Sequence, residues 1–283
     1  TLTGNVIPNN EASFDDEVLD PSVTLEWDAN DDVMLYASYK ESFRSGGFNA
    51  SSAGFRLPGQ TYSADFTFQR EDITAYEGGF KGDFGDRVRI NAAAYYYDFA
   101  NKQVTFATNP LIATERAIVN TDDELYGFEV DGTFVLNENF TARGSYAYID
   151  GTAGDTVNPL NPADVRSYPE LQGTPKNSYM MAIDYNGKLG NKDLFGNLTF
   201  SHKDDILAIP ESALRLPAID LVSGRIGMSF DTSNGAKATI ALWGTNLLDE
   251  EYLIDSLPFE TFAYRTDVYG QPRSYGISAG LTF

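Results

Sequence analysis

Side chains that could perform catalysis are scarce in this sequence. His202 is the only histidine and there is no cysteine. Any serine–histidine dyad or histidine-based metal site would have to be built around this one residue, and no serine has a spacing that favours such a dyad. Thiol catalysis and cysteine-based zinc sites are excluded. We therefore expect no enzyme and no catalytic residue, and we interpret His202 as a residue at the end of a strand.

Three acidic clusters are the other candidates for chemistry, because hard cations such as calcium prefer carboxylate oxygens. They are Asp15-Asp16-Glu17, Asp122-Asp123-Glu124 and Asp249-Glu250-Glu251. None has the regular spacing of a calcium-binding loop. We interpret them as solvated loop charge and expect no metal site and no cofactor. The formal net charge of -21 has the wrong sign for a protein that neutralises nucleic-acid phosphates, so no nucleic-acid partner is expected.

Alternation of apolar and polar residues predicts the elements that position these side chains. Period-two alternation indicates eleven strands, at about 21–28, 33–44, 73–84, 87–99, 124–136, 140–149, 177–186, 194–203, 219–231, 237–246 and 273–283. Most are ten residues or longer, whereas soluble strands average about 5 or 6 residues. Strands of roughly 9 to 11 residues are what a tilted strand needs to cross an outer membrane. Such strands show only alternation, so a mean hydropathy of -0.30 is compatible with a membrane protein.

The links between the strands alternate strictly between short and long. Five are tight, and five are long and rich in Pro, Asn, Ser and Asp, at about 45–72, 100–123, 150–176, 204–218 and 247–272. Short periplasmic turns and long extracellular loops are typical of a transmembrane β-barrel, whereas a soluble sandwich has no reason for this asymmetry. Tyrosines near the long links and phenylalanines near the short links predict two aromatic girdles: Tyr76, Tyr126, Tyr148, Tyr179 and Tyr275 on one side, and Phe134, Phe140, Phe230 and Phe283 on the other.

Charged residues of the opposite parity are expected to line the lumen, because an Arg or Lys facing lipid at midplane costs about 2 to 4 kcal/mol. These residues are Glu77, Lys81, Arg87, Arg89, Glu129, Asp131, Arg143, Arg225 and Lys237. Thr1 to Asn5 lack the basic start and apolar core of a signal peptide, so we expect a mature chain or a fragment.

Four segments resemble the TonB-dependent receptor family, in the family's order and over essentially the whole chain. They are LYASYKESFRSGGFNA at 35–50, YEGGFKGDF at 76–84, NTDDELYGFEVDGTF at 120–134 and LWGTNLLDEEY at 242–252. In the last segment Leu248 stands where the family more often has Phe. The final strand, from Tyr275 to an aromatic carboxy-terminus at Phe283, resembles the signal read by the barrel assembly machinery in many outer-membrane families.

The resemblance implies an all-β fold, a transmembrane antiparallel meander β-barrel. Residues 1–283 would form the C-terminal half of a 22-stranded barrel, without the N-terminal plug, the TonB box and the earlier strands. It also implies a receptor in the cell outer membrane of a Gram-negative bacterium. Such a receptor takes up a scarce nutrient, most often a ferric siderophore, when TonB with ExbB and ExbD energises gating. Outer-membrane lipids and lipopolysaccharide are the expected surroundings.

Ligand contacts are expected in the extracellular loops, where aromatic area and positive charge combine. The candidates are Arg44, Phe48, Phe55, Arg56, Tyr62 and Tyr168. Two alternatives stay open at this point, a passive porin-like channel and a surface adhesin barrel, since a fold does not fix a function.

Overall fold

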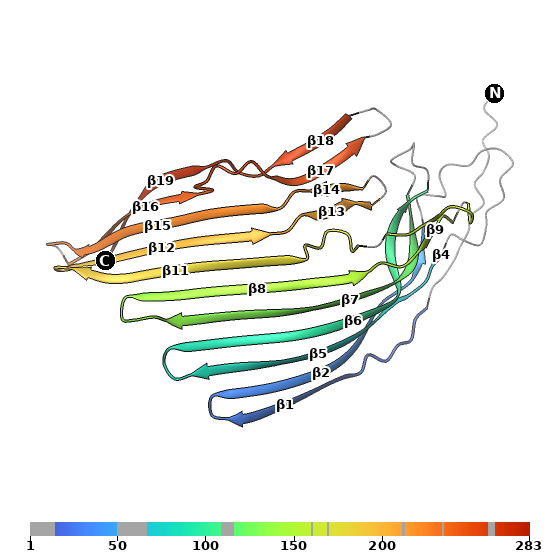
Figure 1. Cartoon of the computed structure of the whole chain (residues 1–283), viewed down its shortest axis with the longest axis horizontal. Helices are drawn as coiled ribbons and strands as arrows, with labels where there is room; N and C mark the ends of the chain where they lie inside the picture. Colours follow the sequence, from blue (N-terminus) through green and yellow to red (C-terminus); the bar gives the residue numbers. More distant parts are fainter. Residues whose placement is uncertain are drawn as a thin grey trace.

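Eleven long strands form one antiparallel sheet in which each strand pairs with the next long strand along the chain (Figure 1). The computed structural model describes residues 15–49, 67–108, 116–159, 161–168, 170–210, 213–233, 235–259 and 264–283. The strands of this sheet are β1 (Ser22–Asn30), β2 (Val33–Arg44), β5 (Glu71–Phe84), β6 (Val88–Ala107), β7 (Arg116–Val135), β8 (Phe140–Thr152), β11 (Asn177–Leu189), β12 (Lys192–Lys203), β15 (Ile219–Asp231), β16 (Lys237–Thr245) and β19 (Ser274–Thr282).

The expected all-β meander of eleven strands is confirmed. Strands β1 and β19 are the two ends of the sheet order and do not pair with each other. In the described part of the chain, no helix is long and apolar enough to cross a membrane.

The short links all lie at one end of the sheet, at the left of Figure 1, which we call the turn end. Gly85 and Gly190 adopt φ values of 61° and 63° there, a left-handed conformation that glycine reaches without steric penalty. At the β7–β8 link, the Asn137 side chain accepts the amide hydrogens of Asn139 and Phe140 at 2.9 and 3.0 Å. These local contacts explain why two to four residues suffice to reverse the chain.

The long links gather at the opposite end, which we call the loop end, and four of them carry short hairpins that the sequence pattern did not indicate. These are β3 (Gly47–Phe48) with β4 (Thr67–Phe68), β9 (Thr156–Val157) with β10 (Val165–Arg166), β13 (Ile206–Ile209) with β14 (Leu214–Leu216), and β17 (Leu253–Phe259) with β18 (Tyr264–Tyr269). Strands of two to seven residues are too short to show a clear alternation.

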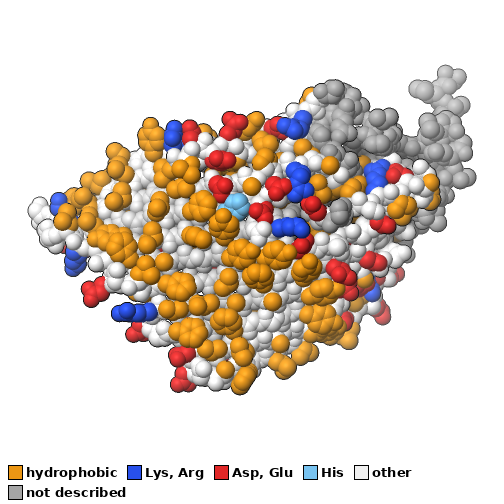
Figure 2. Space-filling model, in the orientation of Figure 1, with side chains coloured by type: hydrophobic (Ala, Val, Ile, Leu, Met, Phe, Trp, Pro, Cys, Tyr) orange, Lys and Arg blue, Asp and Glu red, His pale blue; other side chains and the backbone are white. Residues whose placement is uncertain are grey.

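One face of the sheet is apolar and exposed. Cross-strand pairs place large hydrophobic side chains on this apolar face, and Met181, Ile226 and Ile277 are 61, 65 and 73% exposed. Figure 2 shows hydrophobic side chains spread over the strands, with many of the charged side chains towards the two ends. Monomeric soluble proteins rarely expose a continuous apolar surface of this extent, so the face is built for a nonpolar environment.

The other face is polar, and its charges pair across strands. Arg143 on β8 donates two hydrogen bonds to Asp184 on β11, at 2.7 and 3.0 Å, and Asn197 on β12 donates to the same carboxylate at 2.7 Å. Asn91 on β6 donates to Asp131 on β7 at 3.0 Å. The strand registers place Arg143 and Asp131, two of the charges expected to face the lumen, on this face.

Aromatic rings mark both ends of the apolar face. Towards the loop end, Tyr76 lies between Tyr39 and Tyr96, with ring centroids 5.3 and 6.4 Å apart. Towards the turn end, the rings of Phe140 and Tyr185 are 4.9 Å apart. Aromatic rings therefore lie towards both ends of the apolar face, as expected for two girdles, although Tyr185 accompanies Phe140 at the turn end.

Candidate functional site

A β-bulge at Asn101 changes which face of the sheet the loop-end part of β6 presents. The register between β6 and β7 shifts between Phe99 and Lys102, and Asn101 adopts a φ of 55°. Because successive side chains point to opposite faces, one extra residue moves every later side chain of β6 to the other face. Lys102 and Phe106 therefore lie on the polar face, together with Thr121 of β7.

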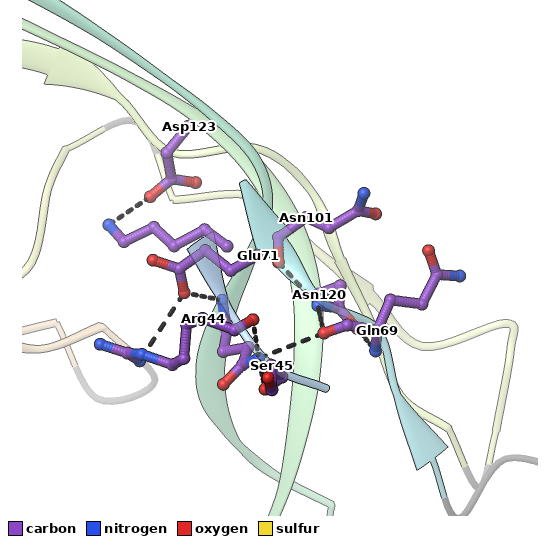
Figure 3. Close-up of polar contacts among 9 residues, drawn as sticks. Arg44, Ser45, Gln69, Glu71, Asn101, Asn120 and Asp123 are labelled. Carbon is purple, nitrogen blue, oxygen red and sulfur yellow. Dashed lines mark hydrogen bonds and ion pairs between the residues drawn. The ribbon is translucent and has the colours of Figure 1, made fainter. Parts of the chain in front are cut away.

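A polar cluster replaces the hydrogen bonds that the bulge interrupts (Figure 3). The amide of Asn101 donates to the Asp122 carboxylate at 2.9 Å, and the side chain of Asn120 donates to the Asn101 carbonyl at 2.6 Å. The amide of Gln103 donates at 2.8 Å to Glu71, which is 4% exposed. Buried carboxylates need such partners because their desolvation is otherwise too costly. The cluster fixes the outer parts of β5, β6 and β7 as one unit.

A buried ion pair lies next to this cluster. Lys102 donates to the Asp123 carboxylate at 2.7 Å, and Asp123 is 2% exposed. The amide of Gly154, from the β8–β11 link, donates to the same carboxylate at 3.1 Å. The pair therefore joins β6 and β7 to the link that follows β8.

The β9–β10 hairpin packs on the tip of β6. The Arg166 guanidinium lies 4.2 Å from the centroid of the Phe106 ring, which is 2% exposed. Asn158 donates to the carbonyl of Thr108 at 2.9 Å and to Asp164 at 2.9 Å. Hydrogen bonds from Arg166 and then Asn158 hold the pKa of Asp164 below its ordinary value, so the carboxylate stays charged and keeps both partners.

The β13–β14 hairpin is attached to the same link by a shared guanidinium. Arg215 donates to Glu170 at 2.7 Å and to Asp205 at 2.5 Å. The two carboxylates, Glu170 first, raise the pKa of Arg215 above its ordinary value. The Gln172 side chain donates to the Ala208 carbonyl at 2.7 Å, and the Gly173 amide donates to the Leu207 carbonyl at 2.9 Å.

Together these segments enclose a cavity of about 570 Å³, which we call the loop-end cavity. Its volume falls within the range of about 300 to 1,000 Å³ that is typical of small-molecule sites. Lining residues come from β6, β7, the β8–β11 link, β13 and β17: Lys102, Val104, Thr105, Phe106, Arg116, Thr121, Asp123, Ala153, Gly154, Thr156, Tyr168, Glu170, Gln172, Ala208, Ile209, Pro210, Asp255, Ser256 and Leu257.

The cavity combines apolar walls with a few polar groups. Thr121 is 6% exposed, and its buried hydroxyl has no hydrogen-bond partner within the described residues. A buried hydroxyl without a partner is unfavourable unless a ligand or water satisfies it. The Asp255 carboxylate accepts the Ser256 amide at 2.7 Å, and Ser256 donates its own hydroxyl to Asp267 at 2.5 Å.

One of the ligand contacts expected from the sequence lines this cavity. Tyr168 is a lining residue and its side chain interacts with Arg166. Arg44 and Phe48 are at the loop end but do not line the cavity: Arg44 lies 3.7 Å from Glu71, and Phe48 is a half-exposed residue of β3. The expected contacts Phe55, Arg56 and Tyr62 lie outside the described residues.

Sequence reasoning missed Lys102, Phe106, Thr121 and Asp255. A signal for the first three was present in the β-branched and aromatic residues of 104–106 and 117–121, which favour paired strands on both sides of the link. Asn101 also marked the bulge, since asparagine tolerates a positive φ better than most residues.

His202 lies at the loop-end terminus of β12 and does not line the cavity. Its Nδ1 is 2.8 Å from Asp220 and its Nε2 is 3.0 Å from Asp204. An imidazole that donates to two carboxylates carries a proton on each nitrogen and joins β12 to β15. In the described part of the chain, no group of three or more metal-ligating side chains could hold a metal ion.

Comparisons with known proteins agree with this architecture. A family model described as "TonB dependent receptor-like, beta-barrel" matches residues 1–247. The chain is similar to the ferric yersiniabactin uptake receptor FyuA from Yersinia pestis, with a TM-score of 0.70, 14% identity and coverage of 93% of this chain and 37% of that one.

Two further solved structures show the same similarity. The ferric preacinetobactin receptor BauA from Acinetobacter baumannii gives a TM-score of 0.66 at 18% identity and covers 93% of this chain and 36% of that one. The ferric citrate transporter FecA in its unliganded form gives a TM-score of 0.63 at 20% identity. This match covers 93% of this chain and 37% of that one. The chain thus spans little more than a third of the length of these structures.

Proposed function

We propose, because this chain belongs to the β-barrel family of TonB-dependent receptors, that it forms the C-terminal half of the wall of an outer-membrane receptor that takes up a ferric siderophore. Members of this family are transporters and not enzymes. The observation that carries the proposal is the loop-end cavity, which opens among the long links of a sheet matching siderophore receptors.

The proposed orientation follows from the two faces of the sheet. The apolar face contacts the lipid of a Gram-negative outer membrane, the turn end lies in the periplasm, and the loop end lies outside among lipopolysaccharide. The polar face, with Arg143, Asp184 and Asn197, lines the lumen. Eleven strands whose two end strands do not pair with each other match half of a 22-stranded barrel. Residues 1–283 therefore form one unit of the barrel wall in this proposal.

The proposed mechanism is ligand binding followed by energised gating. A barrel of about 22 strands has a lumen wide enough to need a plug, so a ligand passes only when work moves the plug. TonB with ExbB and ExbD supplies that work through a region outside this chain, and the barrel assembly machinery inserts the wall through the strand that ends at Phe283.

Separate measurements of binding and uptake test this proposal. Cells expressing the full-length receptor are given radiolabelled iron as ferric trihydroxamate, ferric tricatecholate and ferric citrate complexes, with and without TonB. We expect surface binding of at least one complex in both strains and accumulation only in the strain with TonB. Equal accumulation without TonB would indicate a passive porin-like channel instead.

A further inference from the structure

The positive charges at the loop-end cavity already have interaction partners within the protein. Lys102 pairs with the buried Asp123 at 2.7 Å. Arg116 also takes part in an interaction within the chain. Arg215, which pairs with the lining residue Glu170, also pairs with Asp205. A guanidinium or ammonium group that already has a carboxylate partner attracts an anionic ligand far less than an unpaired one.

The negative charges are not fully neutralised. The Asp255 carboxylate lines the cavity and has no cation at ion-pair distance within the described residues. Among the charged lining residues, the three carboxylates of Asp123, Glu170 and Asp255 outnumber the two cations by one. The lining therefore presents a small excess of negative charge to whatever occupies the cavity.

The surrounding links increase this excess. In the described parts of residues 44–72, 98–124, 150–176, 203–220 and 246–273, 18 Asp and Glu stand against 10 Lys and Arg. This difference of 8 is more than a third of the net charge of -21 in the whole chain. Like charges gathered around an opening sum to a potential that lowers the local concentration of anions and raises that of cations.

Ferric complexes differ in charge according to their ligating groups. Three hydroxamates neutralise a ferric ion, whereas three catecholates leave a complex with three negative charges. A neutral or cationic complex enters the loop-end cavity without electrostatic repulsion. A triply negative complex faces repulsion from Asp255 and from the acidic links.

We propose, as an extension of the proposed function, that the loop-end cavity selects ferric complexes that are neutral or positively charged over anionic ones. The selecting group is Asp255, which lines the cavity and has no cation at ion-pair distance within the described residues.

The test measures affinities of the purified full-length receptor for three probes: a ferric trihydroxamate with a free amine, a neutral ferric trihydroxamate and a ferric tricatecholate. We expect the first two to bind at least about tenfold more tightly than the third. Raising the salt concentration should weaken binding of the cationic probe, because salt screens its attraction to the carboxylates. Binding of the tricatecholate should not weaken, because salt screens its repulsion instead. Tightest binding by the tricatecholate would overturn the inference while leaving the proposed receptor function intact. Absence of binding by all three would overturn both.

A matched pair of variants locates the selecting charge. Asp255→Asn keeps an oxygen for the Ser256 amide and removes the charge. We expect it to reduce the preference for the cationic over the neutral probe by about two- to threefold, as Coulomb's law gives for charges about 8 Å apart in water-like surroundings. Asp249→Asn removes a carboxylate of the same link that pairs with Arg273 at 3.1 Å outside the cavity, and should leave the preference unchanged. Equal effects of both variants would assign the selectivity to overall charge and overturn the role of the cavity.

Discussion

Arginine substitutions along β11 test the assignment of the two faces most directly. Met180 and Met181 are identical residues at adjacent positions, and the strand register places them on opposite faces. Met181 lies on the apolar face and is 61% exposed, while Met180 is half-buried on the polar face. Ile183 lies on the apolar face two residues nearer the turn end. An arginine at Met181 or Ile183 places a positive charge on the apolar face, and an arginine at Met180 places it on the polar face.

The depth of each position sets the expected magnitude. A strand that rises about 3.3 Å per residue with a tilt of about 40° descends about 2.5 Å per residue. Counted from Tyr179, Met181 therefore lies about 5 Å inside the girdle and Ile183 about 10 Å, near the middle of an apolar band about 25 Å tall. We expect Ile183→Arg to cost about 2–4 kcal/mol and Met181→Arg about 1–2 kcal/mol. Met180→Arg, on the lumen side, should change stability by less than about 0.5 kcal/mol.

Urea unfolding of the full-length receptor folded into phospholipid vesicles, followed by tryptophan fluorescence, measures these differences. The ordering of the three variants matters more than any single value. Similar losses for Met180→Arg and Met181→Arg, or a larger loss for Met180→Arg, would refute the face assignment and the proposed membrane orientation with it.

Three further predictions concern assembly, strand packing and pH. Deletion of Phe283 should lower the outer-membrane level of the receptor without lowering its synthesis, because it removes the aromatic residue that follows β19; unchanged levels in membrane fractions would contradict this. Gly127→Val should destabilise the barrel by about 1–3 kcal/mol, because a Cβ there would lie 2.3 Å from the Tyr148 carbonyl and 2.7 Å from the Tyr95 hydroxyl; Gly280→Val, where nothing lies within 4 Å, is the control for the unfolding midpoint. A hydrogen bond from His202 holds the pKa of Asp204 below its ordinary value, so the stabilisation is present above about pH 4 and is lost as the pH falls through the lowered pKa. Protease cleavage near 204–218 should therefore accelerate in acid, and Asp204→Asn should remove that dependence.

The strands were predictable because one physical pattern determines them. A strand with one apolar and one polar face must alternate at every residue, and this pattern places most of the expected strands within a few residues of the observed ones. The alternation also predicts which side chains share a face. It predicted Arg143 and Asp131 on the polar face correctly, since neither strand has a bulge at those positions.

The loop end was less predictable because distant contacts determine its structure. The two-residue strand β3 is held in place by Asn49, whose side chain exchanges hydrogen bonds with the backbone of Ile118, 69 residues away. Neither residue alone indicates this contact. The preference for aromatic and basic loop residues therefore includes Tyr168, which lines the loop-end cavity, alongside Arg44 and Phe48, which lie elsewhere at the loop end.

The bulge at Asn101 explains why the cavity itself escaped prediction. Extending the alternation of β6 without a bulge places Lys102 and Phe106 on the apolar face, where a charge is unfavourable. The period-two pattern alone predicts a strand that ends near residue 99. The bulge instead turns these two side chains to the polar face, where Lys102 meets Asp123 and Phe106 supports Arg166. A single residue in a left-handed conformation thus extends β6 into the wall of the loop-end cavity. Substitutions beyond the bulge therefore change the lining of this cavity, while the strands below it keep one apolar and one polar face.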